Sequence, residues 1–212
     1  VDGWDDPRMP TLSGLRRRGY TPISIFSFVE KAGVAKNFSI VDIALLEHCL
    51  RDELNANALR KIAVLEPVKL VIDNYPEGQT ETLYVEIHPD HPEMGTRKVT
   101  FGKTLYVEQE DFMVEPVKKY FRLFPGNEVR LKSAYFVKCV GYDADENGNV
   151  TCVHCTYDPE SRGGNSPDGR KVKGTLHWVS EADSFKAEVR LYDRLFNKEN
   201  PSDESAGAFT EN

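Results

Sequence analysis

The sequence predicts an α+β protein, in which a small helical subdomain precedes antiparallel β-barrels. Two observations carry this prediction. Up to about residue 60, helix caps flank apolar residues that recur at three- and four-residue spacing, as on one buried face of a helix. After residue 60, short strand-like runs are separated by Pro, Gly and Asp, and this pattern is typical of barrels with tight hairpin turns.

The segment 3–22 predicts a short rigid turn that ends in a group of arginines. Pro7 and Pro10 precede an apolar turn, and the basic group then consists of Arg16, Arg17 and Arg18. Three adjacent guanidinium groups suit an anionic partner such as phosphate. They also suit a solvated helix end, where cations offset the helix dipole. Charge alone favours the solvated helix end.

Two helices are predicted after this turn. Thr21 is a good N-cap with Pro22 in the first helical position, so a helix is expected over 23–32, where Gly33 ends it. Ser39 and Asp42 resemble a capping box that starts a longer helix. The apolar stripe of that helix consists of Ile43, Leu46, Leu50 and Leu54.

The remaining chain predicts strands and their turns. Strands are expected at 68–72, 82–87, 98–101, 104–107, 134–142, 150–157, 174–179 and 186–192. The tetrapeptide Glu146-Asn-Gly-Asn is a strong hairpin signal between two of them. Residues 158–170 are rich in Gly, Pro, Ser and Asp, and an exposed loop is expected there.

Composition limits the function classes. The chain has 212 residues and a net charge of −7, so it is not a basic nucleic-acid-binding protein as a whole, although basic clusters occur at 118–138 and 162–173. No apolar run is long enough to cross a bilayer and no signal-peptide pattern opens the chain. The four cysteines favour a reducing compartment. The first residue is Val1, which suggests a piece of a longer protein.

No catalytic or metal site is predicted from spacing. Cys152-Val-His-Cys155 has the spacing of half a zinc site, but a matching second pair is missing, and the two cysteines would point to opposite faces of a strand. Packing is therefore the favoured interpretation. His88 and His91, which are followed by Pro89 and Pro92, favour a surface turn.

The basic cluster at 118–138 combines cations with aromatic residues. In an extended chain, Arg130 and Lys132 share one face, while Val129 and Leu131 face a core. Unstacked RNA bases are bound by such donors and by stacking on aromatic rings. An ordinary solvated strand face is an equally good interpretation of this pattern.

Several longer strings resemble the tRNA-binding half of the bacterial glutaminyl-tRNA synthetases. They follow the order of that family over nearly the whole chain, at 3–20, 67–75, 88–99, 128–135, 168–179 and 189–196. The strings Leu-Arg-Arg-Arg-Gly-Tyr and Arg-Leu-Tyr-Asp-Arg-Leu-Phe favour this family over the related non-bacterial-type glutamyl enzymes. Those enzymes, a stand-alone RNA-binding barrel protein and an acidic protein-interaction module remain alternatives.

The resemblance implies which residues read the anticodon. Arg60 matches a base-reading arginine at the start of the family's proximal barrel, and Arg122 and Arg130 match arginines of its distal barrel. Lys132 replaces an arginine of well-known relatives and Lys119 replaces a glutamine. These replacements keep the charge or polarity of the position but not the geometry for two parallel hydrogen bonds.

Other positions match tRNA contacts outside the barrel strands. Asp42 stands where relatives place a glutamate that touches the inner corner of the tRNA. Asn55 and Asp90 match positions near the anticodon loop. The resemblance also makes the basic group of segment 3–22 a contributor to the surface that faces the tRNA elbow.

The resemblance implies four regions and a class I ligase. They are a helical elbow-contacting subdomain at 1–59, a partial proximal barrel at 60–115, a distal barrel at 116–196, and a polar tail or linker at 197–212. The parent enzyme would attach glutamine to its tRNA with ATP in protein biosynthesis. The catalytic domain, which binds ATP, is expected to be missing, so the fragment should be inactive alone and hold no cofactor. A cytoplasmic monomer that binds tRNA, but not DNA or membranes, is expected.

Overall fold

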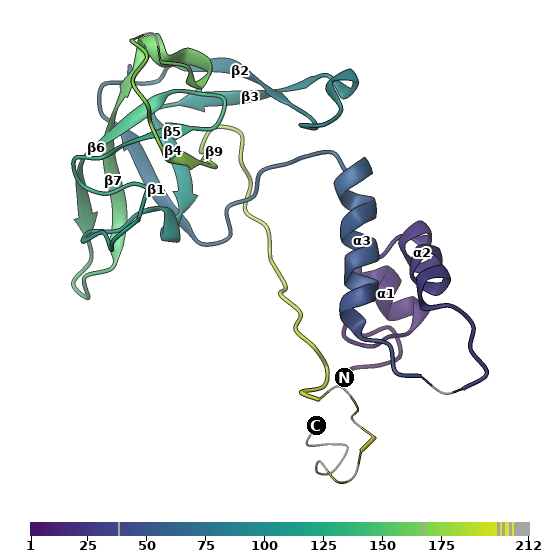
Figure 1. Ribbon diagram of the computed structural model, residues 1–212. Coiled ribbons are helices and arrows are strands. Elements are labelled where there is room, and N and C mark those ends of the chain that lie inside the picture. Colours follow the sequence, from purple (N-terminus) through teal and green to yellow (C-terminus); the bar gives the residue numbers. More distant parts are fainter. Residues whose placement is uncertain (38, 167, 199, 201, 204, 206–212) are drawn as a thin grey trace. The chain divides into compact units, whose positions relative to one another are not determined.

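A computed structural model describes residues 1–212 except 38, 167, 199, 201, 204 and 206–212 (Figure 1). Much of the predicted tail at 197–212 therefore lies outside the described residues. The chain divides into two compact units, and each is described by itself. The first unit comprises Val1–Ala58 with Val189–Asn212, and the second comprises Leu59–Glu188.

The first unit contains helices α1 (Leu12–Arg18), α2 (Pro22–Ala32) and α3 (Ile43–Asn57). Its small core is formed by Leu15, Tyr20 and Leu46, with Ile25, Phe28 and Leu50 packed around them. None of the helices in the described part of the chain has the length and apolar character needed to cross a membrane.

The helix starts follow from their caps, with one correction. The Thr21 hydroxyl accepts a hydrogen bond from the Ser24 N–H at 3.1 Å, and Pro22 occupies the first helical position, as predicted. The predicted capping box that begins at Ser39 is wrong. Asp42 is itself the N-cap of α3, because its carboxylate accepts from the Ala44 N–H at 2.8 Å.

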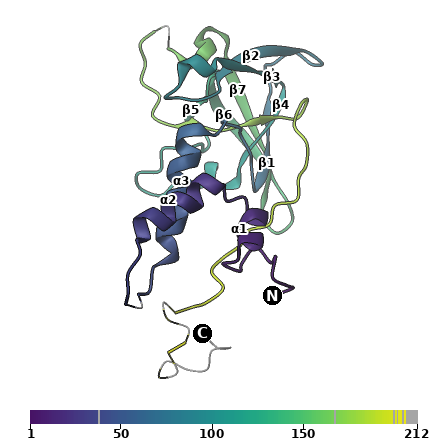
Figure 2. The same cartoon turned by 90° about the vertical axis from the view of Figure 1, so that its right-hand side faces the viewer.

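The second unit is built on a seven-stranded sheet with the order β8-β5-β6-β7-β1-β4-β9, and the hairpin β2–β3 forms a separate sheet. Figures 1 and 2 show β6, β7 and β1 side by side. The strands are β1 (Pro67–Ile72), β2 (Thr80–Glu86), β3 (Thr96–Gly102), β4 (Thr104–Glu108), β5 (Glu128–Leu131), β6 (Phe136–Ala144), β7 (Val150–Asp158), β8 (Thr175–Leu176) and β9 (Val179–Ser180). Three short 3-10 helices join them, namely η1 (Pro92–Met94), η2 (Gln109–Asp111) and η3 (Pro159–Gly164).

The α+β class is confirmed, and the sheet adds two features that the sequence did not predict. The strand pairs β1–β7 and β5–β8 are parallel. Through the β1–β7 pair, strands from 60–115 and from 116–196 join one sheet. The assignment of these ranges to a proximal and a distal barrel remains a prediction.

Two local predictions are corrected. The strand expected at 186–192 does not form, and those residues are largely exposed, because no neighbouring strand pairs with them. The exposed loop expected at 158–170 contains η3, where Ser161 is fully buried. The Ser161 hydroxyl accepts from the Phe136 N–H at 2.8 Å and donates to the Asp158 carbonyl at 2.7 Å.

The hairpin between β6 and β7 forms as predicted. Gly148 has φ +83°, a left-handed conformation that suits glycine in this turn. The Asp145 carboxylate accepts from the N–H groups of Asn147 and Asn149 at 2.9 and 2.8 Å. The turn therefore fixes which residues of β6 lie opposite those of β7.

An aromatic core holds the sheet against the β2–β3 hairpin. Phe101 of β3 is fully buried, and four rings surround it at centroid distances of 5.0 to 6.4 Å, namely Tyr75, Tyr135, Tyr157 and Trp178. Burial and the neighbouring Glu81 carboxylate raise the pKa of Tyr75 to about 12. Burial and Glu81 also raise the pKa of Tyr135, so the two hydroxyls that donate to Glu81, those of Tyr75 and Tyr135, are neutral at physiological pH.

Candidate nucleic-acid interface

Strand β5 presents cations outward because its side chains alternate between two faces. Val129 and Leu131 are fully buried, whereas Arg130 is half-buried and Lys132 is exposed, as the sequence predicted. The backbone of Lys132 is fixed by an N–H donated to the Leu176 carbonyl at 2.9 Å. Its own carbonyl accepts from Trp178 Nε1 at 3.0 Å.

Phe121 is the exposed aromatic group beside this strand. Its side chain is 51% exposed, and Lys173 Nζ lies 5.0 Å from its ring centroid, within cation–π range. Sequence reasoning did not select Lys173, because nothing in the spacing of the chain indicates its contact with Phe121.

Gly174 lets the backbone of Phe121 pack closely against β5. A Cβ atom at Gly174 would lie 2.2 Å from the Phe121 carbonyl oxygen and 3.0 Å from Val129 Cγ1, so only glycine permits this approach. The Gly174 carbonyl also accepts from the Arg130 N–H at 2.9 Å. We use the name β5 surface for the accessible ring and cations on and beside this strand. It consists of Phe121, Arg122, Arg130, Lys132 and Lys173.

Arg122 contributes a half-exposed guanidinium to the β5 surface. Its Nη1 lies 2.8 Å from Asp111 Oδ1, and the side chains are 50% and 10% exposed respectively. Burial raises the pKa of Asp111, and the arginine charge opposes that rise. Half of the Arg122 side chain stays exposed and the guanidinium has five N–H donors, so the residue can hold Asp111 and still bind an anion or a base edge.

The neighbouring turn has an unusual backbone. Lys119 has φ +70°, which is uncommon for a residue with a side chain, and it is exposed. The Tyr120 N–H donates to the Val117 carbonyl at 3.0 Å and closes this turn. Burial raises the pKa of Tyr120 to about 12, so its hydroxyl is a neutral donor to the Glu110 carbonyl.

The two arginines of the second basic cluster are neutralised. Arg170 forms ion pairs with three carboxylates, at 2.9 Å to Glu128, 2.5 Å to Asp158 and 2.8 Å to Asp168. These carboxylates raise the pKa of Arg170. Arg162 likewise pairs with Glu81 at 3.1 Å. These two arginines therefore stabilise the fold and leave little positive charge for a ligand, whereas Lys173 of the same cluster stays accessible.

Arg60 and Asp90 lie near one end of the β2–β3 hairpin. The Arg60 N–H donates to the Ile87 carbonyl at 2.9 Å, directly after β2. Asp90 is exposed, and its N–H donates to His88 Nδ1 at 3.1 Å. The hydrogen bond to His88 agrees with a turn at the two histidines, but His88 itself is buried, which corrects the expectation that both lie on a surface turn.

The first unit holds the other predicted positions. Asp42 caps α3, and Asn55 is exposed near the end of the same helix. Arg17 pairs with Asp5 at 3.1 Å, and Arg18 approaches Glu47 at 3.6 Å. Among the described residues, Arg16 is exposed and forms no ion pair.

Family models match almost the whole chain. Residues 58–158 and 175–212 match anticodon-binding domains of the class I tRNA synthetases for glutamate and glutamine. Residues 1–56 match the catalytic domain of the same group. The chain therefore contains only a small part of this catalytic domain.

Curated relatives agree with these matches. A glutamine–tRNA ligase of Bradyrhizobium diazoefficiens is 60% identical over 95% of the chain and 36% of the relative. Another, of Clostridium kluyveri, is 60% identical over 92% of the chain and 35% of the relative. A third, of Vibrio vulnificus, is 54% identical over 95% of the chain and 36% of the relative. The chain thus spans about a third of the length of these relatives.

Proposed function

Because the chain belongs to the class I synthetases for glutamate and glutamine, we propose that it is the anticodon-binding portion of a glutamine–tRNA ligase. The parent enzyme would join glutamine to its tRNA with ATP. ATP binding belongs to the catalytic domain, of which residues 1–56 match a part. The chain alone would bind tRNA without catalysing the reaction, as a cytoplasmic monomer.

The β5 surface is the observation that supports this proposal most directly. It comprises an exposed ring, two guanidinium groups and two ammonium groups on and beside β5, and Gly174 lets the Phe121 backbone pack against Val129 of this strand. Single-stranded bases bind proteins by stacking on such rings and by hydrogen bonds to their exposed edges. Lysines near the strand would contact phosphates and supply affinity without base specificity.

Arg130 and Arg122 are proposed to read bases. The Arg130 guanidinium lies over the Phe136 ring, 5.1 Å from its centroid, so the ring limits where this group can lie. Among the described residues Arg130 forms no ion pair, and its buried Nε–H has no hydrogen-bond partner. The forked donors of an oriented guanidinium suit a base edge or a phosphate.

The remaining predicted residues are assigned to neighbouring parts of the tRNA. Arg60 and Asp90 are proposed to contact the anticodon loop from the end of the β2–β3 hairpin. Asn55 is proposed to contact the same loop, and Asp42 the inner corner of the tRNA. Arg16 is the strongest candidate of the three adjacent arginines for a phosphate at the elbow, because the other two are already paired.

The test compares binding of glutamine tRNA with binding of the same tRNA carrying an altered anticodon. The wild-type chain should prefer the unaltered tRNA. Arg130→Ala should remove about 1–3 kcal/mol of that preference, by analogy with base-reading contacts in DNA complexes. Lys186→Gln, which removes an exposed lysine outside the β5 surface, should change neither affinity.

Equal affinity of the wild-type chain for both tRNAs would overturn anticodon reading. A parallel measurement with glutamate tRNA separates the glutamine enzyme from its glutamyl relatives. Preference for glutamate tRNA would overturn the glutamine assignment and retain the anticodon-binding role.

A further inference from the structure

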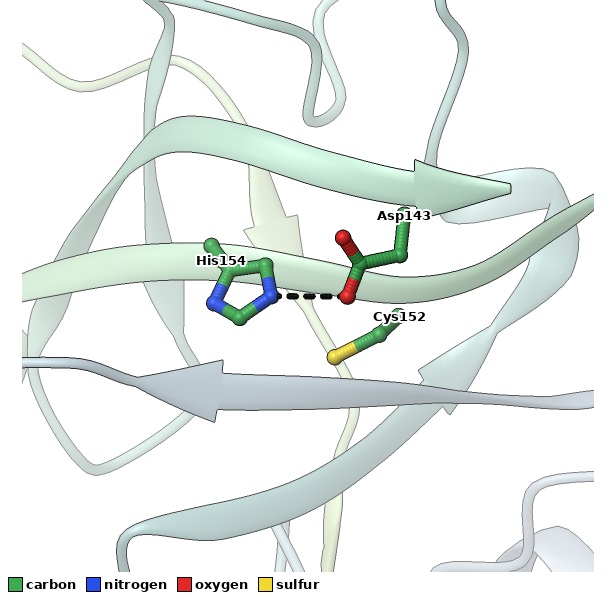
Figure 3. Close-up of side chains that lie close together, drawn as sticks. All are labelled: Asp143, Cys152 and His154. Atoms are coloured by element: carbon green, nitrogen blue, oxygen red, sulfur yellow. Dashed lines mark hydrogen bonds and ion pairs between the residues drawn. The ribbon is translucent and has the colours of Figure 1, made fainter.

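A cluster of side chains of the types that bind metals lies on the β6–β7 hairpin, outside the residues proposed to bind RNA. It consists of Asp143 of β6 with Cys152 and His154 of β7, and their donor atoms all lie within 4.8 Å of one another (Figure 3). No residue of the cluster is used by the tRNA-binding proposal, so the two can be tested separately.

Strand geometry explains the cluster. Cys152 and His154 are two residues apart, so they share one face of β7. Asp143 lies directly opposite Cys152 in the β6–β7 register. Cys155 points to the other face and is fully buried, which confirms its packing role.

His154 is held between two carboxylates. Its Nε2 lies 3.1 Å from Asp143 Oδ2, and its Nδ1 lies 3.0 Å from Asp73 Oδ1. Asp73 directly follows β1, the strand that pairs with β7 on its other side. A histidine that binds a metal usually donates its second ring N–H to a carboxylate, which fixes the ring and its tautomer. Asp73 occupies that position.

We propose that Asp143, Cys152 and His154 bind a divalent zinc ion, with Asp73 as the positioning residue for His154. Thiolate, imidazole and carboxylate together are the donors that zinc prefers, whereas magnesium and calcium prefer oxygen donors alone. The Cys152 thiol loses its proton to solvent when the metal–sulfur bond forms. Water supplies the fourth ligand.

The distances suit this ion after a small adjustment. Tetrahedral zinc, with ligands at about 2.0–2.3 Å, holds its donor atoms roughly 3.3–3.6 Å apart. The separation of 3.1 Å between His154 Nε2 and Asp143 Oδ2 is already close to this range. The side chains of Asp143 and His154 are 66% and 32% exposed, so an ion can reach the site from solvent.

The charges around the site also favour a cation. With a thiolate, the cluster and Asp73 carry three negative charges. On β1, Lys69 lies opposite Cys152. Its Nζ pairs with Glu181 at 3.5 Å. A bound ion would link β6 to β7 beyond their backbone ladder and, through Asp73, tie both to β1.

Cobalt(II) titration of the full chain tests the site, because a cobalt–thiolate bond produces a charge-transfer absorption that oxygen and nitrogen ligands do not. One equivalent of cobalt should produce this absorption, and zinc should abolish it by displacement. Cys152→Ser should remove the absorption, and Asp73→Asn should lower the affinity by about 10–100-fold.

The matched control is His91→Ala. His91 lies 2.8 Å from Glu93 and forms a comparable exposed histidine–carboxylate pair without a cysteine, so its removal should leave the cobalt absorption unchanged. Zinc should also raise the midpoint of thermal unfolding of the wild type and of this control, but not of Cys152→Ser. That comparison also shows whether each variant is folded.

Two outcomes would overturn the proposal. The first is a folded wild-type chain that gives no cobalt–thiolate absorption. The second is an absorption that survives in Cys152→Ser, since the thiolate would then come from another cysteine.

Discussion

At the scale of single residues, the partners of a charge decide its role. Arg130 and Arg170 both lie 5.1 Å from the Phe136 ring centroid, one in each basic cluster of the sequence. Three carboxylates surround Arg170, whereas Arg130 forms no ion pair among the described residues. In the sequence, each is an arginine of a basic cluster. In the structure, only Arg130 keeps guanidinium N–H donors for a ligand.

The buried hydroxyl of Ser161 holds the backbone of Phe136 in place. Ser161→Ala should lower the free energy of unfolding of the second unit by about 1–3 kcal/mol, because the Phe136 N–H would lose its acceptor in a buried position. Urea denaturation measures this change. The exposed Ser184→Ala should stay within about 0.5 kcal/mol of the wild type. Equal stability of all three chains would show that another group accepts the Phe136 N–H.

At the scale of elements, capping and strand alternation place the candidate residues. The alternation of β5 buries Val129 and Leu131 and leaves Arg130 and Lys132 accessible. Asp42 shows that one residue can have two roles. It caps α3, and it also stands at a position that the family resemblance connects with tRNA.

Substitution of Asp42 separates these roles. Asp42→Ala should destabilise the first unit by about 0.5–2 kcal/mol, because the first turn of α3 would lose its acceptor. Asp42→Asn should keep the cap and nearly all of the stability. Circular dichroism during denaturation measures the difference. If Asn destabilises as strongly as Ala, the carboxylate charge rather than the cap contributes the stability.

At the scale of the whole molecule, an acidic chain is proposed to bind a polyanion. The net charge of −7 gives no general attraction to RNA, so binding must depend on local surfaces such as the β5 surface. The acidic residues that neutralise Arg162 and Arg170 make the remaining accessible cations more important.

The salt dependence of tRNA binding tests this view. Affinity should fall as salt rises, and Lys132→Gln should reduce the slope of log K against log salt by about 0.7, the value for one phosphate contact on a single strand. Filter binding at several salt concentrations gives the slope. A slope identical to that of the wild type would contradict a phosphate contact at Lys132. The control variant Lys186→Gln should keep the wild-type slope.

The sequence by itself determined the features that depend on near neighbours. Thr21 and Pro22 start α2, the Asn-Gly turn closes the β6–β7 hairpin, and β5 alternates, because caps, turns and side-chain direction are set within a few residues. The family resemblance likewise rested on short stretches of consecutive residues. The strand predicted at 186–192 failed, because a strand needs a partner that local pattern cannot supply.

Only the tertiary structure decided which distant residues meet. It showed the parallel β1–β7 pair, the contact of Lys173 with Phe121 across Gly174, and the neutralisation of Arg170. The sequence suggested Cys152 and Cys155 as half a metal site. In the structure, Cys152 instead lies beside residues of β6, β7 and the end of β1. Strand order and register set these contacts, and both depend on long-range packing that residue spacing along the chain does not encode.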